Sequence, residues 1–300
     1  MPLPSQVKIV EVGPRDGLQN ENRQISTAAK IELVERLAEA GCRFIEAASF
    51  VSPAWVPQMA DSADVLARLR RKPGVVYAAL TPNLRGFDAA LAAGADEMAI
   101  FAAASESFSR KNINCSIDES LARFAPVMAS AQHAGQKVRG YVSCVVGCPY
   151  EGEIDPAAVA RVAESLAAMG CFEISLGDTI GVGTPRQVQR MIEAVAARIG
   201  VEKLAGHFHD TYGMATANVY AAMEMGVSIF DSSVAGLGGC PYAKGASGNV
   251  ATEELIWLMR GLGVETGIDL ARLVDCSLWI SNALGREPSR VARALAASGK

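Results

Sequence analysis

The feature that most constrains the fold of this chain is a regular alternation of short apolar runs with longer amphipathic stretches. The runs are continuously apolar and do not alternate with polar residues, which is typical of strands buried on both faces of a parallel sheet. They comprise residues 7–12, 44–48, 75–80, 97–102, 138–145, 172–176, 204–208 and 228–234.

Residues 27–40 illustrate the stretches that separate these runs. Their apolar side chains recur at helical spacing on one face, which predicts an amphipathic helix packed on a sheet. Glu32 and Arg36 are four residues apart, where opposite charges attract each other on a helix, and Gly41 supplies a stop signal.

Eight strand–helix units within about 260 residues match the count and size of an α/β protein of the (β/α)8 TIM-barrel type. An open, doubly wound sheet is the main alternative, but the eight repeats fill the length too evenly for it. We expect residues 1–263 to form the catalytic barrel domain. Residues 264–300 predict two further helices, broken near 285–288, that pack on the barrel as a C-terminal appendage.

Composition narrows the possible functions. The 300 residues carry a formal net charge of −4, which gives no electrostatic footprint for nucleic acid or an anionic membrane. No run reaches the roughly 18 apolar residues of a membrane span. The seven cysteines are scattered and mostly inside apolar runs, which favours a reduced, cytoplasmic setting. Residues 1–6 are too few to hold a targeting peptide before the first predicted strand.

Two histidines close the seventh predicted strand, in a barrel whose active site is expected at the C-terminal ends of the strands. Side chains at i and i+2 of a strand point to the same side, so His207 and His209 face one space. They are either metal ligands or two buried histidines hydrogen-bonded to neighbours, with Asp210 capping the next helix. Two imidazoles do not complete a metal site, so oxygen ligands are expected from elsewhere.

Charged residues also follow three other strand ends. Arg15 and Asp16 come after the first strand, and they form either a surface ion pair in a loop or a catalytic pair. In a catalytic pair, the arginine would stabilise an oxyanion and the aspartate would be a metal ligand or base. Glu46 ends the second run, and because an isolated buried charge is costly, we expect Arg15 to be its partner. Asp178, just past the sixth strand, fits a turn or cap as well as a catalytic role.

The segment after the eighth strand, residues 235–249, is too rich in glycine for a plain connector, and we expect a mobile lid there. It is not a Walker loop, because Gly-Lys-Ser/Thr is absent, and Pro241 replaces the last glycine of a dinucleotide fingerprint. Cys240 lies in this flexible setting, where a thiol can be reached. Asn249 suits the N-cap of a helix that begins at residue 250.

With these residues in place, the sequence resembles the 3-hydroxy-3-methylglutaryl-CoA lyases, within the wider DRE-TIM metallolyase superfamily. The resemblance extends from Val7 to about Gly263. It is carried by five segments: residues 11–21 (EVGPRDGLQNE), 49–59 (SFVSPAWVPQM), 140–152 (GYVSCVVGCPYEG), 175–184 (SLGDTIGVGT) and 231–249 (DSSVAGLGGCPYAKGASGN).

The resemblance implies a complete set of site residues. A divalent cation, Mg²⁺ or Mn²⁺, would be held by Asp16, His207, His209 and Asn249. The catalytic residues would be Arg15, Asp16, Glu46, Asp178, His207 and Cys240. Besides Arg15, the positions near an acyl-CoA substrate would be Asn112, Tyr141, Ser175 and Thr179.

The implied reaction is a retro-Claisen cleavage of 3-hydroxy-3-methylglutaryl-CoA to acetyl-CoA and acetoacetate, as in leucine breakdown and ketone-body formation. A hard cation would lower the pKa of the substrate hydroxyl, and Asp16, or a base that it positions, would take the proton. Arg15 would stabilise the enolate oxygen. Cys240 would help to protonate the enolate carbon or exclude water, and His207 would share in proton transfer.

Three alternatives stay open at this point. A condensing enzyme of the isopropylmalate or homocitrate synthase type, or a 4-hydroxy-2-oxoacid aldolase, would share the barrel and the two histidines. We would not expect residues 236–249 (GLGGCPYAKGASGN) in either. A lyase for a longer 3-hydroxy-3-alkylglutaryl-CoA fits the same residues. A catalytically dead barrel that serves as a scaffold conflicts with the complete ligand set.

Two departures from the family pattern bear on the pocket and on assembly. Residues 214–216 (Met-Ala-Thr) stand where Gln-Ala-Leu is expected, which affects the detail of the pocket. The chain ends without the C-terminal cysteine that animal members use for thiol-linked regulation of the dimer, so we do not expect that control. A homodimer is still the expected assembly.

Overall fold

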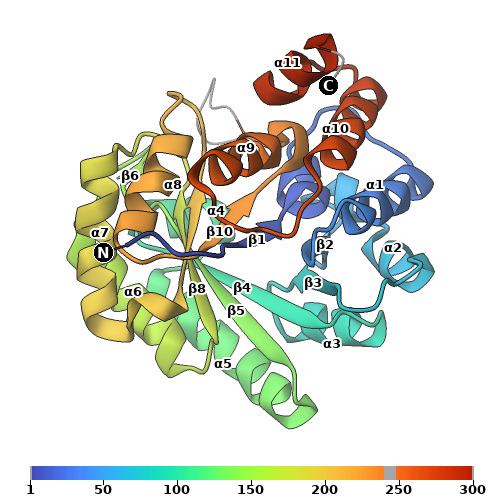
Figure 1. Ribbon diagram of the computed structural model, residues 1–300. Coiled ribbons are helices and arrows are strands. Elements are labelled where there is room, and N and C mark those ends of the chain that lie inside the picture. Colours follow the sequence, from blue (N-terminus) through green and yellow to red (C-terminus); the bar gives the residue numbers. More distant parts are fainter. Residues whose placement is uncertain (1, 240–247, 299–300) are drawn as a thin grey trace.

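Eight parallel strands close into a barrel in the computed structural model, which describes residues 2–239 and 248–298 (Figure 1). Around the barrel, each strand lies beside its neighbours in the chain, and the first strand pairs with the last to close the sheet. The barrel strands are β1 (Lys8–Glu11), β2 (Phe44–Ser49), β3 (Val76–Leu80), β4 (Glu97–Ala103), β5 (Lys137–Ser143), β8 (Glu173–Asp178), β9 (Leu204–Phe208) and β10 (Ile229–Ser232).

Each predicted apolar run coincides with one of these strands, apart from small shifts at the ends. The prediction of a (β/α)8 barrel is therefore confirmed, and the open doubly wound sheet is excluded. A short antiparallel pair, β6 (Gly147–Cys148) and β7 (Gly152–Glu153), is inserted after β5 and stands outside the barrel sheet.

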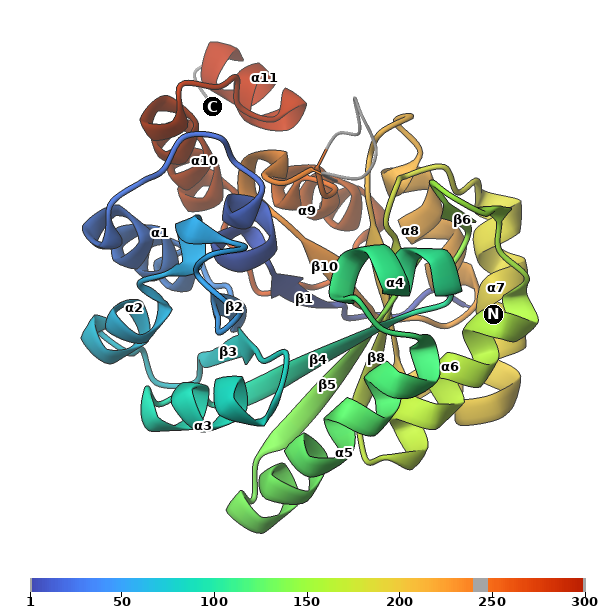
Figure 2. The same ribbon diagram turned by 180° about the vertical axis from the view of Figure 1, so that it is seen from behind.

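Helices surround the barrel, and further helices at the C-terminal end of the chain pack on its outside (Figures 1 and 2). No helix in residues 2–239 or 248–298 is long and apolar enough to cross a bilayer. The α-helices are α1 (Thr27–Glu39), α2 (Ser62–Arg68), α3 (Leu84–Ala92), α4 (Glu106–Ile113), α5 (Ile117–Ala134), α6 (Pro156–Ala168), α7 (Pro185–Ile199), α8 (Ala215–Glu224), α9 (Thr252–Leu262), α10 (Leu270–Leu284) and α11 (Arg290–Ser298).

The part of the chain that the structure describes also contains four short helical turns at strand and helix ends. They are the π-helical turn η1 (Gly13–Gly17) and the 3₁₀ turns η2 (Pro57–Met59), η3 (Val201–Lys203) and η4 (Val234–Gly236). The turns η1 and η4 directly follow β1 and β10, the two strands that close the barrel.

Helix α1 shows how local sequence sets the element boundaries. The Ser26 side chain accepts a hydrogen bond from the backbone N–H of Ala29 and so caps the helix start. Glu32 and Arg36 pair as predicted, with Nε 2.9 Å from Oε1. The helix ends just before Gly41, whose φ of +101° only glycine adopts without strain.

Within the described residues, two helices follow α9, which confirms the prediction of extra C-terminal helices. Helix α10 packs against α1 and α9, and both views show α10 and α11 on the same side of the barrel as α1. Buried side chains of α10, such as Leu273 and Ile280, belong to the same core as the barrel helices. The division of the chain at residue 263 stays a prediction.

We predict that Gly41→Ala lowers the free energy of unfolding by about 1–3 kcal/mol, because it combines positive φ with a steric overlap. A Cβ at this position would overlap the carbonyl oxygen of Gly267 in the loop before α10. Gly135→Ala is the matched control, with φ of +66° and no neighbour within 4 Å, and should lose only about 1 kcal/mol. Unfolding in urea measures the free energy of unfolding of both variants, and equal decreases in the two would contradict the proposed overlap.

Candidate active site

The turn η1 places Arg15 and Asp16 at the C-terminal end of β1, inside the barrel mouth. A π-helical turn is uncommon and is found preferentially at functional sites. A Cβ on Gly17 would lie only 2.7 Å from Cβ of Leu237, so glycine lets this turn pack directly against the segment after β10. Arg15 is only 5 % exposed, which excludes the alternative of a surface loop pair.

The buried guanidinium of Arg15 lies between two carboxylates. Its Nε donates to Oε2 of Glu46 at 2.6 Å, and its Nη1 donates to Oδ1 of Asp16 at 2.7 Å. The predicted Arg15–Glu46 partnership is therefore confirmed. Burial lowers the pKa of Arg15, but the charges of Glu46 and Asp16 outweigh burial and raise the pKa above its ordinary value. The arginine is a permanent cation at the barrel mouth.

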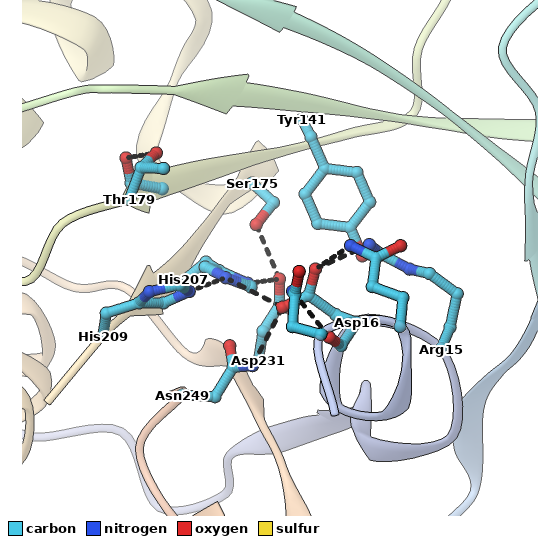
Figure 3. Close-up of polar contacts among 12 residues, drawn as sticks. Arg15, Asp16, Tyr141, Ser175, Thr179, His207, His209, Asp231 and Asn249 are labelled. Carbon is cyan, nitrogen blue, oxygen red and sulfur yellow. Dashed lines mark hydrogen bonds and ion pairs between the residues drawn. The ribbon is translucent and has the colours of Figure 1, made fainter. Parts of the chain in front are cut away.

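His207 and His209 turn their rings toward Asp16, as Figure 3 shows. The Nε2 atoms of the two rings are 3.3 Å apart, and Oδ2 of Asp16 lies 3.9 Å from Nε2 of His207. One potential ligand atom from each of the three residues lies within 4.8 Å of the others. Among the described residues, Asp16, His207 and His209 are the group of histidine, cysteine and carboxylate side chains close enough together to hold a metal ion.

Asn249 completes this cluster from the segment before α9. Its Nδ2 donates to Oδ2 of Asp16 at 2.9 Å and to the carbonyl oxygen of Leu237 at 3.2 Å. The N-cap role that the sequence allowed is wrong, because α9 begins at Thr252 with Ala251 as its N-cap. Instead, Asn249 forms an isolated β-bridge with His209, which brings the two side chains together.

The polar atoms of this cluster fit a divalent cation. Within the described part of the chain, Oδ1 of Asn249 is buried without a hydrogen-bond partner, and so is Nδ1 of His209. A buried amide oxygen left over in this way is a ready ligand for a hard cation. Together with the Asp16 carboxylate and two imidazoles, it makes a mixed oxygen and nitrogen donor set suited to Mg²⁺ or Mn²⁺.

Electrostatics favour the protonation states that a cation needs at His209 and Asp16. At His207 burial lowers the pKa, but the hydrogen bond and charge of Asp231 outweigh burial and raise it. Burial and then the neighbouring His207 lower the pKa of His209 to about 4, so this ring is neutral near pH 7. Burial alone would raise the pKa of Asp16, but Arg15 and the two imidazoles reverse this effect and lower it. A neutral imidazole beside an ionised carboxylate is the form in which both groups bind a metal.

Sequence reasoning missed a buried ionic network beneath this cluster. The Arg139 guanidinium donates to Glu173 at 2.6 Å and to both oxygens of Asp231 at 2.7 and 3.1 Å. Lys8 reaches the other oxygen of Glu173 at 2.9 Å. All four residues lie in the apolar runs that become strands, and a charged residue inside such a run was the available signal.

Two of the predicted substrate-binding residues contact this network. The Ser175 hydroxyl donates to Oδ2 of Asp231 at 2.7 Å and is fully buried. The Tyr141 hydroxyl accepts from Nη1 of Arg139 at 2.8 Å and donates to Glu46 at 3.3 Å. Tyr141 therefore links the Arg15–Glu46 pair to Arg139, whereas Ser175 contacts the carboxylate that also meets His207.

Glu11 is a further buried carboxylate that sequence reasoning missed. It accepts hydrogen bonds from the backbone N–H groups of Gly13 and Val234 and from the Thr252 hydroxyl. These contacts tie η1, η4 and the start of α9 to one point below the cation cluster. Burial raises the pKa of Glu11 to about 7 against the effect of these hydrogen bonds.

Asp178, Thr179 and Asn112 are the remaining predicted residues in the described part of the chain. The Asp178 carboxylate accepts from the backbone N–H groups of Val182 and Gly183, so it adopts the turn role that its sequence position allowed. Thr179 accepts from the backbone N–H of Cys144 at 2.8 Å. Asn112 is half-buried in α4, the helix that follows β4. Cys240 lies outside the described residues.

Fold and site together define a class of protein: a TIM-barrel enzyme with a candidate divalent-metal site and a fixed arginine at the barrel mouth. Comparison with known proteins identifies the family to which the chain belongs. The family model described as HMGL-like matches residues 6–280. A 3-hydroxy-3-isohexenylglutaryl-CoA/hydroxy-methylglutaryl-CoA lyase of Pseudomonas aeruginosa is 60 % identical over 99 % of both chains.

Solved structures agree with this match. A hydroxymethylglutaryl-CoA lyase from Pseudomonas aeruginosa superimposes with a TM-score of 0.97 at 60 % identity, covering 99 % of this chain and 100 % of its own. A lyase from Acinetobacter baumannii, in complex with coenzyme A and 3-methylmalate, has a TM-score of 0.93 at 37 % identity, with 97 % and 95 % coverage. The chain belongs to the HMGL-like family, and it is a carbon–carbon lyase of the hydroxymethylglutaryl-CoA lyase type.

We predict that Glu46→Ala lowers the free energy of unfolding by about 3 kcal/mol or more, because it leaves the buried Arg15 with only one carboxylate. Glu35→Ala is the control, since it removes a carboxylate from the solvent-exposed Arg70 and should change stability little. Chemical denaturation followed by circular dichroism measures both variants. Equal unfolding midpoints for Glu46→Ala and wild type would contradict a structural contribution of this pair.

Proposed function

We propose that this enzyme cleaves 3-hydroxy-3-methylglutaryl-CoA to acetyl-CoA and acetoacetate with a bound divalent cation. The observation that carries the proposal is the convergence of Asp16, His207, His209 and Asn249 beside the buried cation of Arg15. Release of acetoacetate from hydroxymethylglutaryl-CoA tests it directly. A condensing enzyme would instead release free CoA from acetyl-CoA and a 2-oxoacid.

The reaction breaks the bond between C2 and C3 of the substrate. The C3 hydroxyl loses its proton and becomes the ketone of acetoacetate, while the bonding electron pair moves to C2 and forms the enolate of acetyl-CoA. Protonation of C2 then completes acetyl-CoA. Asp16, His207, His209 and Asn249 would hold the divalent cation, which would supply the Lewis acidity that lowers the pKa of the substrate hydroxyl.

The protein's own groups then have distinct tasks. Asp16, or a base that it positions, takes the hydroxyl proton, and His207 shares in its transfer. Arg15 stabilises the enolate oxygen, since its charge is permanent and its planar guanidinium is held by Glu46. Glu46 also has one buried oxygen, Oε1, without a partner among the described residues, which leaves an acceptor for the reacting groups.

Two further catalytic residues are proposed from the family resemblance alone. Cys240 would deliver the proton to the enolate carbon or exclude water, and it lies outside the described residues. Asp178 would act through the loop that it holds together, because its carboxylate binds two backbone N–H groups of that loop.

The substrate is proposed to be an acyl-CoA, supported by the coenzyme A in the Acinetobacter baumannii relative. Asn112, Tyr141, Ser175 and Thr179 would lie near it with Arg15. A cytoplasmic location is proposed because the cysteines of the described residues are buried in the core, where a reduced thiol packs as a small apolar side chain. A homodimer is proposed from the family, and light scattering of the purified protein tests it.

A longer 3-hydroxy-3-alkylglutaryl-CoA is a second candidate substrate. The relative from Pseudomonas aeruginosa is named for both an isohexenyl and a methyl substrate, and it is 60 % identical to this chain. The specificity constants for the two acyl-CoA compounds, measured side by side, decide which substrate this enzyme prefers.

We predict that removal of divalent metal abolishes activity, since the substrate hydroxyl is a weak acid without a cation. Treatment with a chelator followed by gel filtration should eliminate acetoacetate release, and added Mg²⁺ or Mn²⁺ should restore it. Circular dichroism before and after treatment serves as the control for folding. Full turnover by enzyme shown to be metal-free would contradict the proposal.

We predict that Arg15→Met lowers kcat about 10²–10³-fold with a smaller change in KM, because Arg15 meets charge that develops only as the bond breaks. Arg15→Lys keeps the charge without the planar guanidinium and should stay strongly impaired. Melting temperature and metal content verify that each variant is folded and loaded. A folded, metal-loaded Arg15→Met enzyme with near-normal kcat would reduce Arg15 to a structural partner of Glu46.

A further inference from the structure

We propose that Asp231 is a positioning residue that fixes the ring orientation and tautomer of His207, so that Nε2 of His207 offers a lone pair to the cation site. The inference rests on the proposed function only in taking His207 as a metal ligand. Asp231 is absent from the ligand, catalytic and substrate-binding sets that the sequence resemblance implied.

Strand register brings the two side chains together. Asp231 in β10 and His207 in β9 are direct partners across the parallel pair, so both point to the same side of the sheet, into the barrel. Nδ1 of His207 lies 3.0 Å from Oδ2 of Asp231, and the carboxylate is 1 % exposed (Figure 3). An ionised carboxylate only accepts hydrogen bonds, so the proton of this contact resides on Nδ1. The other ring nitrogen, Nε2, then faces Asp16 and His209 with its lone pair.

The carboxylate is itself fixed in place. Arg139 donates hydrogen bonds to both of its oxygens. The Ser175 hydroxyl donates to Oδ2, the same atom that contacts Nδ1 of His207. A two-point contact with a guanidinium sets the plane of a carboxylate as well as its position. Carboxylates that orient a metal-binding histidine in this way commonly set metal affinity.

A simpler role for Asp231 would be to neutralise the charge of Arg139. A second carboxylate on the same guanidinium allows this role to be tested separately. Glu173 is a second buried carboxylate on the same guanidinium, 2.6 Å from Nε. It pairs with Arg139 and Lys8, whereas Asp231 pairs with Arg139 and also contacts His207. If charge neutralisation were the only role, the loss of either carboxylate should have the same effect.

The amide variant Asp231→Asn distinguishes these roles because its NH₂ group must face one of two sides. At the Oδ1 position it would meet only Nη2 of Arg139, which cannot accept a hydrogen bond. At the Oδ2 position it would lose the 3.1 Å contact from Nη1 of Arg139, but it also meets Ser175 and His207, and both can switch to accepting. The amide should therefore donate to Nδ1 of His207 and move the ring proton to Nε2, where it blocks the lone pair.

The first measurement is made on wild-type enzyme without metal, labelled with ¹⁵N-histidine, at a pH where the rings are neutral. The chain has only three histidines, so the ring nitrogens can be assigned with a His133→Gln variant and a His209→Gln variant. We expect Nδ1 of His207 to carry the proton. A spectrum with the proton on Nε2 overturns the inference, whether or not any variant of Asp231 folds.

The second measurement compares Asp231→Asn with Glu173→Gln by titration with Mn²⁺, followed by electron paramagnetic resonance, and by the same ring spectra. Asp231→Asn should bind Mn²⁺ about 10–100-fold more weakly and show the Nε2–H tautomer. Glu173→Gln should keep the wild-type tautomer and nearly the wild-type affinity. Equal weakening in both variants with no change of tautomer would show that Asp231 only neutralises Arg139.

The two proposals fail in different ways. If wild-type enzyme does not bind Mn²⁺, the cation site of the proposed function is wrong, while the ring spectrum still decides the tautomer of His207. If wild-type enzyme binds Mn²⁺ and Asp231→Asn binds it equally well, the cation site stands and the positioning role is overturned.

Discussion

The buried guanidinium of Arg15 is the interaction on which the catalytic face of the barrel depends. It joins Asp16, the carboxylate of the cation cluster, to Glu46, which has no other charged partner at hydrogen-bond distance in the described residues. From Glu46 the contacts continue through the Tyr141 hydroxyl to Arg139 and Asp231, and from there to His207. His207 returns to Asp16 at 3.9 Å, so the groups form a closed ring across the barrel mouth.

Such a ring is possible because every parallel strand contributes inward-facing residues at a fixed height. Arg139 is the register partner of Glu173, Tyr141 of Ser175, and Asp231 of His207. Each charged side chain therefore meets an opposite charge or a donor from the neighbouring strand before it meets the apolar core. Removal of one member would leave each of its neighbours with one partner fewer in a buried setting, which couples the members of the ring energetically.

Much of the fold and part of the site could be predicted from the sequence. The strands were predictable because each coincides with a short apolar run. The Arg15–Glu46 pair was predictable because a buried carboxylate needs a cationic partner. The links of Asp231 to His207 and Arg139 were not predicted, because they join residues 24 and 92 positions apart and depend on strand register. The N-cap prediction for Asn249 was wrong for a related reason, since its bridge to His209 replaces the local cap.

The charges of the ring also bear on what the site can bind. Arg15, Arg139 and Lys8 are three cations within contact of four carboxylates, those of Asp16, Glu46, Glu173 and Asp231. The two imidazoles are neutral when they act as ligands, so this set carries one net negative charge.

A bound divalent cation would reverse the sign of this charge to one net positive charge. The free carboxylate of a glutaryl group then neutralises the site, whereas a second anion would leave an uncompensated buried charge, which is costly. The buried network thus favours a divalent cation together with a substrate that brings one negative charge to the barrel mouth. In the proposed mechanism, the enolate that forms during cleavage would add a transient charge next to Arg15, and a guanidinium that is already fixed could stabilise that charge as the bond breaks.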